Sequence, residues 1–281
     1  MVRAAGAPDG GRGVSVTGSI PRAIGWDDPR TVRYYEAFCA RHPRYRAANR
    51  VLIERAALAP GQRVLDVAAG TGRTAEAALP WLHRQGTIVC VEPAAAMRAA
   101  GRVRLADRRV TWTDRLPEPP AGFDRILCGA AIWQLTPLGE TVRRLAALLA
   151  PGGALCFTVP SLYLGEPDEP GAGRDPFLLE LPALLATERA GAAPAAEPLP
   201  DADGVDALLA GAGLRPRRGT LRRRLTQEAY RDWLKIPLLT NFLLPDLEPD
   251  ERARLIDEAY ARVDAASWRW EAWTVWTAWA P

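Results

Sequence analysis

Lysine, histidine and methionine are scarce in this chain of 281 residues. Lys235 is the only lysine, so arginine supplies almost all of the positive charge, and the formal net charge is only +3. Together with frequent alanine, glycine and proline, this usage is typical of a GC-rich coding sequence and gives poor support for a nucleic-acid partner. His42 and His83 are the only histidines, which excludes a histidine-rich metal site.

The chain has only four cysteines: Cys39, Cys90, Cys128 and Cys156. No two of them have the spacing of metal ligands, so we expect no bound metal. The last three fall in apolar runs that predict strands, where a free thiol behaves as a small hydrophobic side chain. We therefore expect no disulfides.

Long hydrophobic runs are absent as well. None approaches the roughly eighteen apolar residues that a membrane helix needs, so we expect no membrane association. Residues 1–25 are rich in glycine, alanine and arginine and lack an apolar core, which predicts a disordered tail rather than a signal peptide. These features indicate a cytoplasmic protein. The 48% apolar content is enough for a globular core of one elaborated domain or a domain with a small cap.

Apolar runs that predict strands alternate with segments of helical periodicity. Strands are expected near residues 63–67, 87–91, 109–113, 124–129 and 153–159, and helices near 29–40, 45–58 and 201–211. This alternation predicts an α/β fold, with a doubly wound parallel sheet covered on both faces. Two more strands are expected after residue 211. The first is an arginine-rich run at 215–224 with a solvated face, for which a nucleic-acid or phosphate site is the alternative. The second is a tryptophan-rich segment at 268–279.

The most informative stretch is the turn that follows the first predicted strand, in residues 64–73. A ligand binds at the carboxyl end of a strand in such sheets. Gly70 and Gly72 would let the backbone approach that ligand closely. Asp66 is unusual because it lies inside an apolar strand.

Glu92 ends the second predicted strand, about twenty residues beyond this turn. An acid at this place faces a ligand bound at the tip of the first strand and can accept hydrogen bonds from both hydroxyls of a ribose. A solvated acid at a strand end is the simpler interpretation, but the spacing from the glycine turn favours the ribose.

These motifs resemble those of the class I S-adenosylmethionine-dependent methyltransferases. The family pattern acid-x-Gly-x-Gly-x-Gly matches residues 66–72 except at Ala68, and Glu92 followed by Met97 matches the second motif. Residues 123–129 resemble the fourth strand of the family, and residues 149–157 the turn into the fifth. The resemblance covers roughly residues 30–160. It implies a Rossmann-like methyltransferase fold with a mostly parallel seven-stranded sheet and an antiparallel last strand. Residues 26–60 would form lid helices, 61–160 the cofactor-binding core, and 161–281 the C-terminal half.

The resemblance also implies S-adenosylmethionine as cofactor and S-adenosylhomocysteine as product. Asp66, Gly70 and Gly72 would hold the methionine end, with Ala68 and Thr71 in the same turn, and Glu92 the ribose. Pro93 and Met97 would pack beside the sugar and base. Asp114, with the backbone of Thr113, is expected at the adenine amino group, although counting along the chain puts Trp112 there. Cys128 and Gly129 would line the methyl-donor channel, and Trp133 would cover the sulfonium or belong to the core.

Methyl transfer depends mainly on holding donor and acceptor in line, so a catalytic residue is hard to identify. Within the predicted lid, His42 and Tyr45 are the catalytic candidates: imidazole is a suitable general base, and related enzymes place a similar tyrosine near the methionine carboxylate. Tyr34 and Tyr35 are expected at the substrate pocket. Two insertions, near residues 161–200 and 227–266, carry apolar side chains that include Trp233 and Phe242. We expect helical caps that line the acceptor pocket; a dimer interface or plain core is the alternative.

The sequence thus predicts transfer of a methyl group to an apolar or aromatic small molecule. A peptide or protein acceptor is the main alternative. A nicotinamide-dependent oxidoreductase is less consistent, because Asp66 stands where a dinucleotide-binding strand carries an apolar residue, although residues 70–75 fit G-x-G-x-x-A. A methyltransferase-like fold that binds without catalysis is a third interpretation. The acceptor atom, the use of specialised or quinone-type substrates and the oligomeric state stay open.

Overall fold

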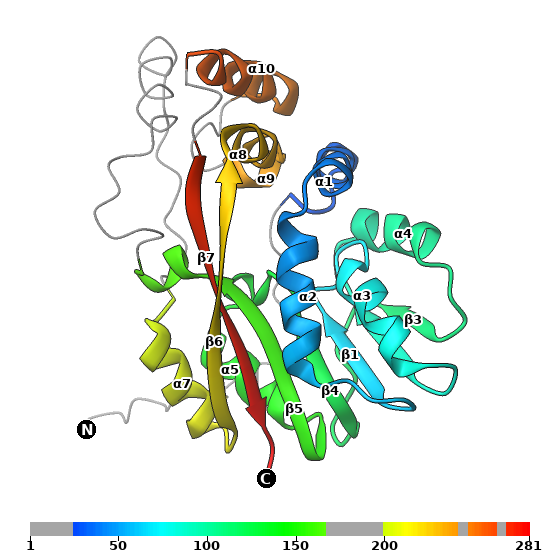
Figure 1. The fold of residues 1–281 in the computed structure, drawn as a ribbon. Coiled ribbons are helices and arrows are strands. Elements are labelled where there is room, and N and C mark those ends of the chain that lie inside the picture. The colour runs from blue at the N-terminus through cyan, green and yellow to red at the C-terminus, as the bar shows by residue number, and fades with distance from the viewer. Residues whose placement is uncertain (1–24, 167–198, 241–246, 263–267) are drawn as a thin grey trace, which may run out of the picture.

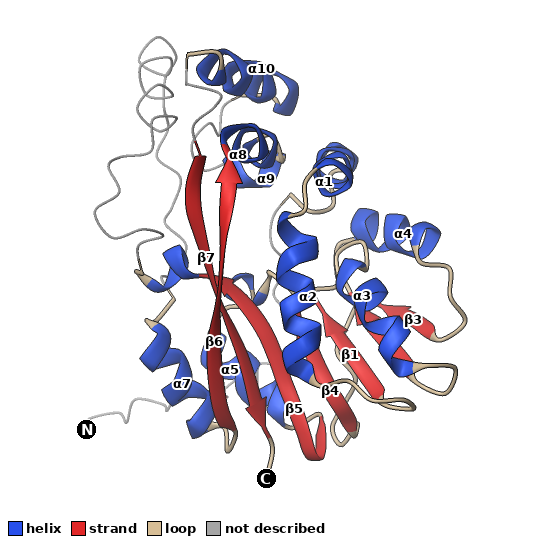
Figure 2. Cartoon of the chain, viewed as in Figure 1, coloured by secondary structure: helices blue, strands red, loops and turns tan. Residues whose placement is uncertain are grey.

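A seven-stranded sheet runs through the computed structural model, which describes residues 25–166, 199–240, 247–262 and 268–281. The strand order is β3-β2-β1-β4-β5-β7-β6. The first five strands in the chain pair in parallel, whereas β7 runs antiparallel to both β5 and β6 (Figures 1 and 2). The predicted seven-stranded α/β sheet with an antiparallel last strand is confirmed.

The elements follow the predicted alternation closely. The strands are β1 (Arg63–Val67), β2 (Thr87–Val91), β3 (Val110–Thr113), β4 (Phe123–Cys128), β5 (Leu149–Pro160), β6 (Arg215–Thr226) and β7 (Trp268–Trp279). The helices are α1 (Pro29–Arg41), α2 (Arg44–Ala56), α3 (Arg73–Leu82), α4 (Ala95–Arg104), α5 (Leu138–Ala146), α7 (Ala202–Gly211), α8 (Gln227–Leu234), α9 (Pro237–Thr240) and α10 (Pro249–Tyr260), with short 3-10 turns η1 (Ile132–Gln134) and η2 (Ser161–Leu164). Only β5 is clearly longer than expected, because it begins at Leu149.

Two apolar layers cover the sheet. Leu65 and Val67 of β1 point into a cluster completed by α5 and α7, whereas Val64 points into a second cluster with α2 and α3. This alternation follows from the period of two along a strand. A buried strand with helices on both faces needs apolar side chains at nearly every position, which explains the continuous apolar runs in the sequence.

Tryptophans spaced by three residues place their rings on alternate faces of β7. Trp276 stacks on Phe157, with ring centroids 5.1 Å apart, and its indole donates to Asp206 at 2.8 Å. Trp273 lies on the opposite face, against Tyr45 of α2. One strand therefore contributes to both layers of the core.

The helices between β6 and β7 gather beyond one end of the sheet, next to α1 (Figure 1). Thr226 caps α8 by accepting a hydrogen bond from the backbone of Ala229, and Glu248 and Glu251 form a capping box on α10. Tyr34 of α1 donates to Asp250 of α10 at 2.7 Å. We call α8, α9 and α10 the cap; it is held against the N-terminal helix.

Parts of the prediction concern residues outside the described ranges. These are the N-terminal tail (residues 1–24), most of the first insertion (167–198), Phe242 within 241–246, and residues 263–267. Within the described ranges, no helix is both long enough and apolar enough to cross a bilayer.

Candidate functional site

A turn in left-handed backbone conformation follows β1. Ala68, Gly70 and Gly72 have φ angles of 53°, 56° and 80°. An added Cβ at Gly70 would meet nothing within 4 Å, whereas one at Gly72 would lie 2.9 Å from the Trp112 ring. Gly70 thus exposes backbone toward open space, and Gly72 allows the Trp112 ring to pack. The glycine turn therefore leaves backbone accessible at Gly70 and makes room for the Trp112 ring at Gly72.

The carboxylate of Glu92 lies at the end of β2 and joins this turn to α4. Its Oε2 accepts a hydrogen bond from the Gly70 backbone at 2.7 Å, and its Oε1 accepts one from Ala94 at 2.8 Å. Burial raises the pKa of Glu92, although both hydrogen bonds and Arg98 oppose that effect. Glu92 also lines the pocket described next, so one carboxylate shapes the pocket floor and faces the ligand space.

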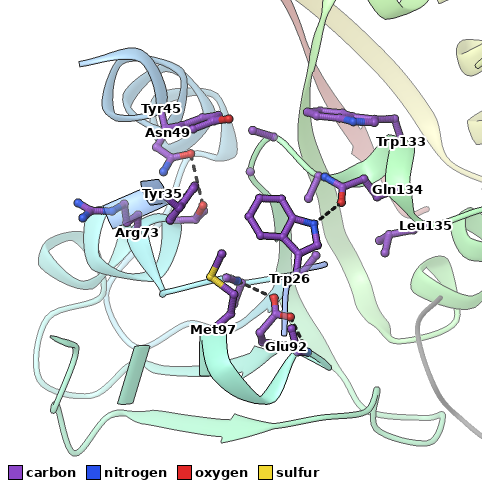
Figure 3. A pocket seen from close by; sticks show the side chains of 18 of the residues that line it. Trp26, Tyr35, Tyr45, Asn49, Arg73, Glu92, Met97, Trp133, Gln134 and Leu135 are labelled. Atoms are coloured by element: carbon purple, nitrogen blue, oxygen red, sulfur yellow. Dashed lines mark hydrogen bonds between the residues drawn. The ribbon is translucent and has the colours of Figure 1, made fainter. Parts of the chain in front are cut away.

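A pocket of about 1050 Å³, including its opening to solvent, lies over the carboxyl ends of β1, β2 and β4. Figure 3 shows Glu92 and Met97 at one end and Tyr45 and Trp133 at the other, with Trp26 between them. The Trp26 indole donates to Gln134 at 2.7 Å. A ring from the N-terminal segment thus covers the middle of the pocket.

Aromatic rings line the end of the pocket beside the cap. Trp233 of α8 donates from its indole to the Tyr45 hydroxyl at 2.9 Å. The Trp133 and Tyr163 rings are in contact, with centroids 5.1 Å apart. Trp233 lines the same pocket as Gly129 at the tip of β4. The second insertion therefore contributes to the pocket wall.

Asp66 lies beneath the turn, fully buried, and does not line the pocket. Its Oδ2 accepts a hydrogen bond from the Ala75 backbone at 3.1 Å, while Oδ1 has no partner among the described residues. Burial raises the pKa of Asp66 to about 8, against the opposing effect of that hydrogen bond. Asp66 therefore holds the start of α3, and its second oxygen is left for a partner.

Many predicted site residues line this pocket. They are Tyr35, Tyr45, Ala68, Gly70, Glu92, Pro93, Met97, Gly129, Trp133 and Trp233. Others lie just outside it: Thr71 donates to Glu36, and Cys128 is buried in the core. Thr113 and Asp114 do not line the pocket, and Asp114 pairs with Arg115 at the surface.

His42 and Tyr34 are placed away from the pocket by ion pairs and hydrogen bonds with the cap. His42 Nε2 lies 2.8 Å from Asp232 Oδ2, and both side chains are buried. Burial raises the pKa of Asp232, but hydrogen bonds from Arg231, His42 and Arg41 outweigh it and lower the pKa to about 2. His42 therefore joins the N-terminal helices to α8, and it does not line the pocket.

Several lining residues were not predicted from the sequence. They are Trp26, Arg44, Asn49, Arg73, Thr74, Gln134 and Tyr163. Arg73 follows the glycine turn directly and pairs with Glu36 of α1. Thr74 follows Arg73 in the chain, and Gln134 and Arg44 adjoin the predicted Trp133 and Tyr45, so these positions also carried a sequence signal. Trp26, Asn49 and Tyr163 come from segments without such a neighbour.

Comparisons with known proteins agree with this geometry. A family model described as a methyltransferase domain matches residues 65–155. The ubiquinone/menaquinone biosynthesis C-methyltransferase of Coxiella burnetii is 33% identical over 116 residues, which cover 37% of this chain and 46% of that protein. The matched region thus spans less than half the length of this relative.

Solved structures show the same fold at low identity. The YcgJ protein of Bacillus subtilis matches with a TM-score of 0.53 and 16% identity, covering 83% of this chain and 98% of its own. A Haemonchus contortus phosphoethanolamine N-methyltransferase, solved with S-adenosylhomocysteine, matches with a TM-score of 0.51 and 17% identity over 83% of this chain and 52% of its own. The Rossmann-like methyltransferase fold is therefore confirmed.

Replacing Ala68 with glycine tests the left-handed turn. Ala68→Gly should leave the free energy of unfolding unchanged or raise it by about 1 kcal/mol, because glycine adopts a positive φ without strain. Ala69→Gly is the matched control, since Ala69 is buried and has no positive φ; it should lower that free energy by about 1 kcal/mol. Urea denaturation measures both. Equal destabilisation by the two variants would contradict strain at Ala68.

The raised pKa of Asp66 predicts a pH dependence of stability. Between the ordinary aspartate pKa of 3.8 and the folded value of about 8, the folded state binds the extra proton. Stability from this group is therefore full below pH 3.8 and decreases as the pH rises to 8. Asp66→Asn removes this dependence, so its melting temperature relative to wild type should be higher at pH 8 than at pH 5. Asp114→Asn, at an exposed position, should show no such difference; the same profile in both variants would refute the assignment.

His42→Ala tests whether His42 joins helices or acts in the pocket. Loss of its bond to buried Asp232 should lower the free energy of unfolding by about 1–3 kcal/mol. Affinity for S-adenosylhomocysteine, measured by calorimetry on folded protein, should change less than about twofold, because His42 does not line the pocket. His83→Ala, at the other and exposed histidine, should change neither quantity. A stable His42→Ala protein that no longer binds would contradict the structural role.

Proposed function

We propose that the protein is a class I methyltransferase that transfers a methyl group from S-adenosylmethionine to an apolar or aromatic small molecule; its residues 65–155 match a methyltransferase-domain model. The observation that carries the proposal is the Glu92 carboxylate at the end of β2, beside the Gly70 turn and open to the pocket. That arrangement suits the two ribose hydroxyls of an adenosyl group.

The residues present fit this cofactor. Glu92 would bind the ribose, and the side chain of Met97 would pack against the adenosyl group. Asp66 Oδ1, buried without a partner among the described residues and outside the pocket lining, can reach the cofactor amino group through a water. Arg73 would face the cofactor carboxylate across the glycine turn. When bound, S-adenosylmethionine supplies a methyl group already activated by its sulfonium.

The protein contributes position and exclusion of water. Trp26 and the cap cover the pocket, and Trp133 stays our candidate for the aromatic ring near the positive sulfonium. Burial raises the pKa of Tyr45 well above its ordinary value. Tyr45 is therefore a neutral phenol at pH 7, which can donate a hydrogen bond to the acceptor but is unsuited as a general base.

The relatives and the pocket walls support a small aromatic acceptor. A relative named for ubiquinone and menaquinone biosynthesis and C-methylation favours a quinone-type ring and a carbon acceptor. The aromatic side chains beside the cap offer flat surfaces to such a ring. A peptide acceptor is the second candidate. We also assign the protein to the cytoplasm, which is supported by its four free cysteines.

Titration calorimetry with S-adenosylmethionine, S-adenosylhomocysteine, NADH and NADPH tests the cofactor. Wild type should bind the first two and neither nicotinamide. Glu92→Gln should weaken the binding of S-adenosylhomocysteine by roughly tenfold. The reason is that an amide cannot accept hydrogen bonds from both ribose hydroxyls and the two backbone donors. Glu118→Gln, at an exposed position, is the matched control. Binding of a nicotinamide, or undiminished binding by Glu92→Gln, would reject the proposal.

A further inference from the structure

A buried arginine lies among the aromatic rings at the acceptor end of the pocket. Arg44 of α2 is 4% exposed and lines the pocket. Its Nε donates to Glu271 Oε1 of β7 at 2.6 Å, and its guanidinium carbon lies 4.1 Å from the centroid of the Trp233 ring. Stacking on rings and pairing with a carboxylate are both favourable for a guanidinium, so Arg44 is held firmly in place.

Two N–H donors that belong to pocket-lining residues have no acceptor. The Nη1 of Arg44 and the Nε1 of Trp273 are both buried and lack a hydrogen-bond partner among the described residues, as do Arg223 Nη1 and Glu271 Oε2 beside them. Trp273 also lines the pocket, and the Arg44 guanidinium lies 5.5 Å from its ring. Leaving a buried donor unpaired costs stability. A ligand that supplies oxygen atoms here would recover that loss.

The charges around Arg44 do not balance. Glu271 lies between two guanidiniums, since Arg223 Nε is 3.9 Å from its Oε2. Within the described ranges, no other carboxylate forms an ion pair with either arginine. Burial lowers the pKa of Arg223, and Arg44 contributes to the decrease. One positive charge is therefore in excess, as expected of a site that receives an anion.

We infer that the acceptor is an aromatic carboxylate, whose two oxygens are bound by Arg44 Nη1 and Trp273 Nε1. The ligand's role as methyl acceptor rests on the proposed function, whereas the anion site itself does not depend on it. Rings from Tyr45, Trp133 and Trp233 would enclose the aromatic body. The two donors are covered in this conformation, so the carboxylate displaces part of the lining on entry.

The site lies apart from the proposed ribose contact. Tyr45, the neighbour of Arg44 in α2, is at the opposite end of the pocket from Glu92 in Figure 3. The Arg44 side chain packs on Trp233 of the cap, and Glu92 bonds to the turn after β1. A carboxylate bound by Arg44 would thus place its ring between the cap and the tip of β4. The aromatic ring of the ligand would then lie between Arg44 and the methyl donor.

The experiment compares 2-naphthoate with its neutral isostere 2-naphthamide, by calorimetry with and without S-adenosylhomocysteine. Wild type should bind the acid roughly tenfold more tightly than the amide, and Arg44→Gln should reduce the preference to less than about threefold. Trp273→Phe keeps an aromatic ring of smaller size, removes the N–H, and should weaken binding of the acid by about threefold. Equal binding of acid and amide by wild type, or an unchanged preference in Arg44→Gln, would overturn the inference.

Controls separate a lost contact from a lost fold. Arg50→Gln removes one positive charge from the same helix at a side chain that is 73% exposed, and should keep the full preference for the acid. Melting temperature and affinity for S-adenosylhomocysteine establish that each variant is folded. If Arg44→Gln does not fold, Trp273→Phe decides alone: unchanged affinity for the acid rejects the site.

The two proposals fail separately. Preference for the acid without any binding of S-adenosylmethionine or S-adenosylhomocysteine would uphold the anion site and reject the methyltransferase activity. Binding of both cofactor forms without preference for the acid would support the methyltransferase activity and reject the anion site.

Discussion

Four backbone segments meet at Glu92, and the pocket depends on that junction. Its carboxylate accepts from the turn after β1 and from the residue before α4, while its own backbone N–H bonds to Thr113 at the end of β3. The side chain is buried, so these bonds compete little with water. The ends of three strands are thereby fixed relative to one another. A ligand at this edge meets a surface that is already organised.

The floor of the pocket could be predicted because its signals are local. Apolar runs of five residues end at Val67 and Val91, and the residues that follow are those that a tight turn and a ligand-facing acid require. The antiparallel direction of β7 followed from family resemblance, because periodicity does not reveal strand direction; its position between β5 and β6 was not predicted. Asp66 was correctly singled out as unusual, yet the structure puts it under the turn.

The walls depend on contacts between distant segments, which a single sequence does not reveal. His42 is a reasonable general base on the chain alone, but its partner Asp232 lies 190 residues away and binds it outside the pocket. Nothing in the sequence distinguishes Arg44 from the other arginines; its pairing with Glu271 of β7 is visible only in the fold. Gly72 matched a cofactor motif, although its lack of a Cβ serves the packing of Trp112. In each case the deciding neighbour comes from another element.

The two ends of the second insertion are direct neighbours: Thr226, the last residue of β6, pairs across the sheet with Trp268, the first of β7. The intervening chain therefore leaves and re-enters the sheet at one place. The entropy cost of closing such a loop grows only slowly with its length. Evolution can accordingly lengthen, shorten or exchange this segment without disturbing the register below it. In the proposed function this segment would shape acceptor selectivity, which could then diverge among relatives faster than the sheet below it.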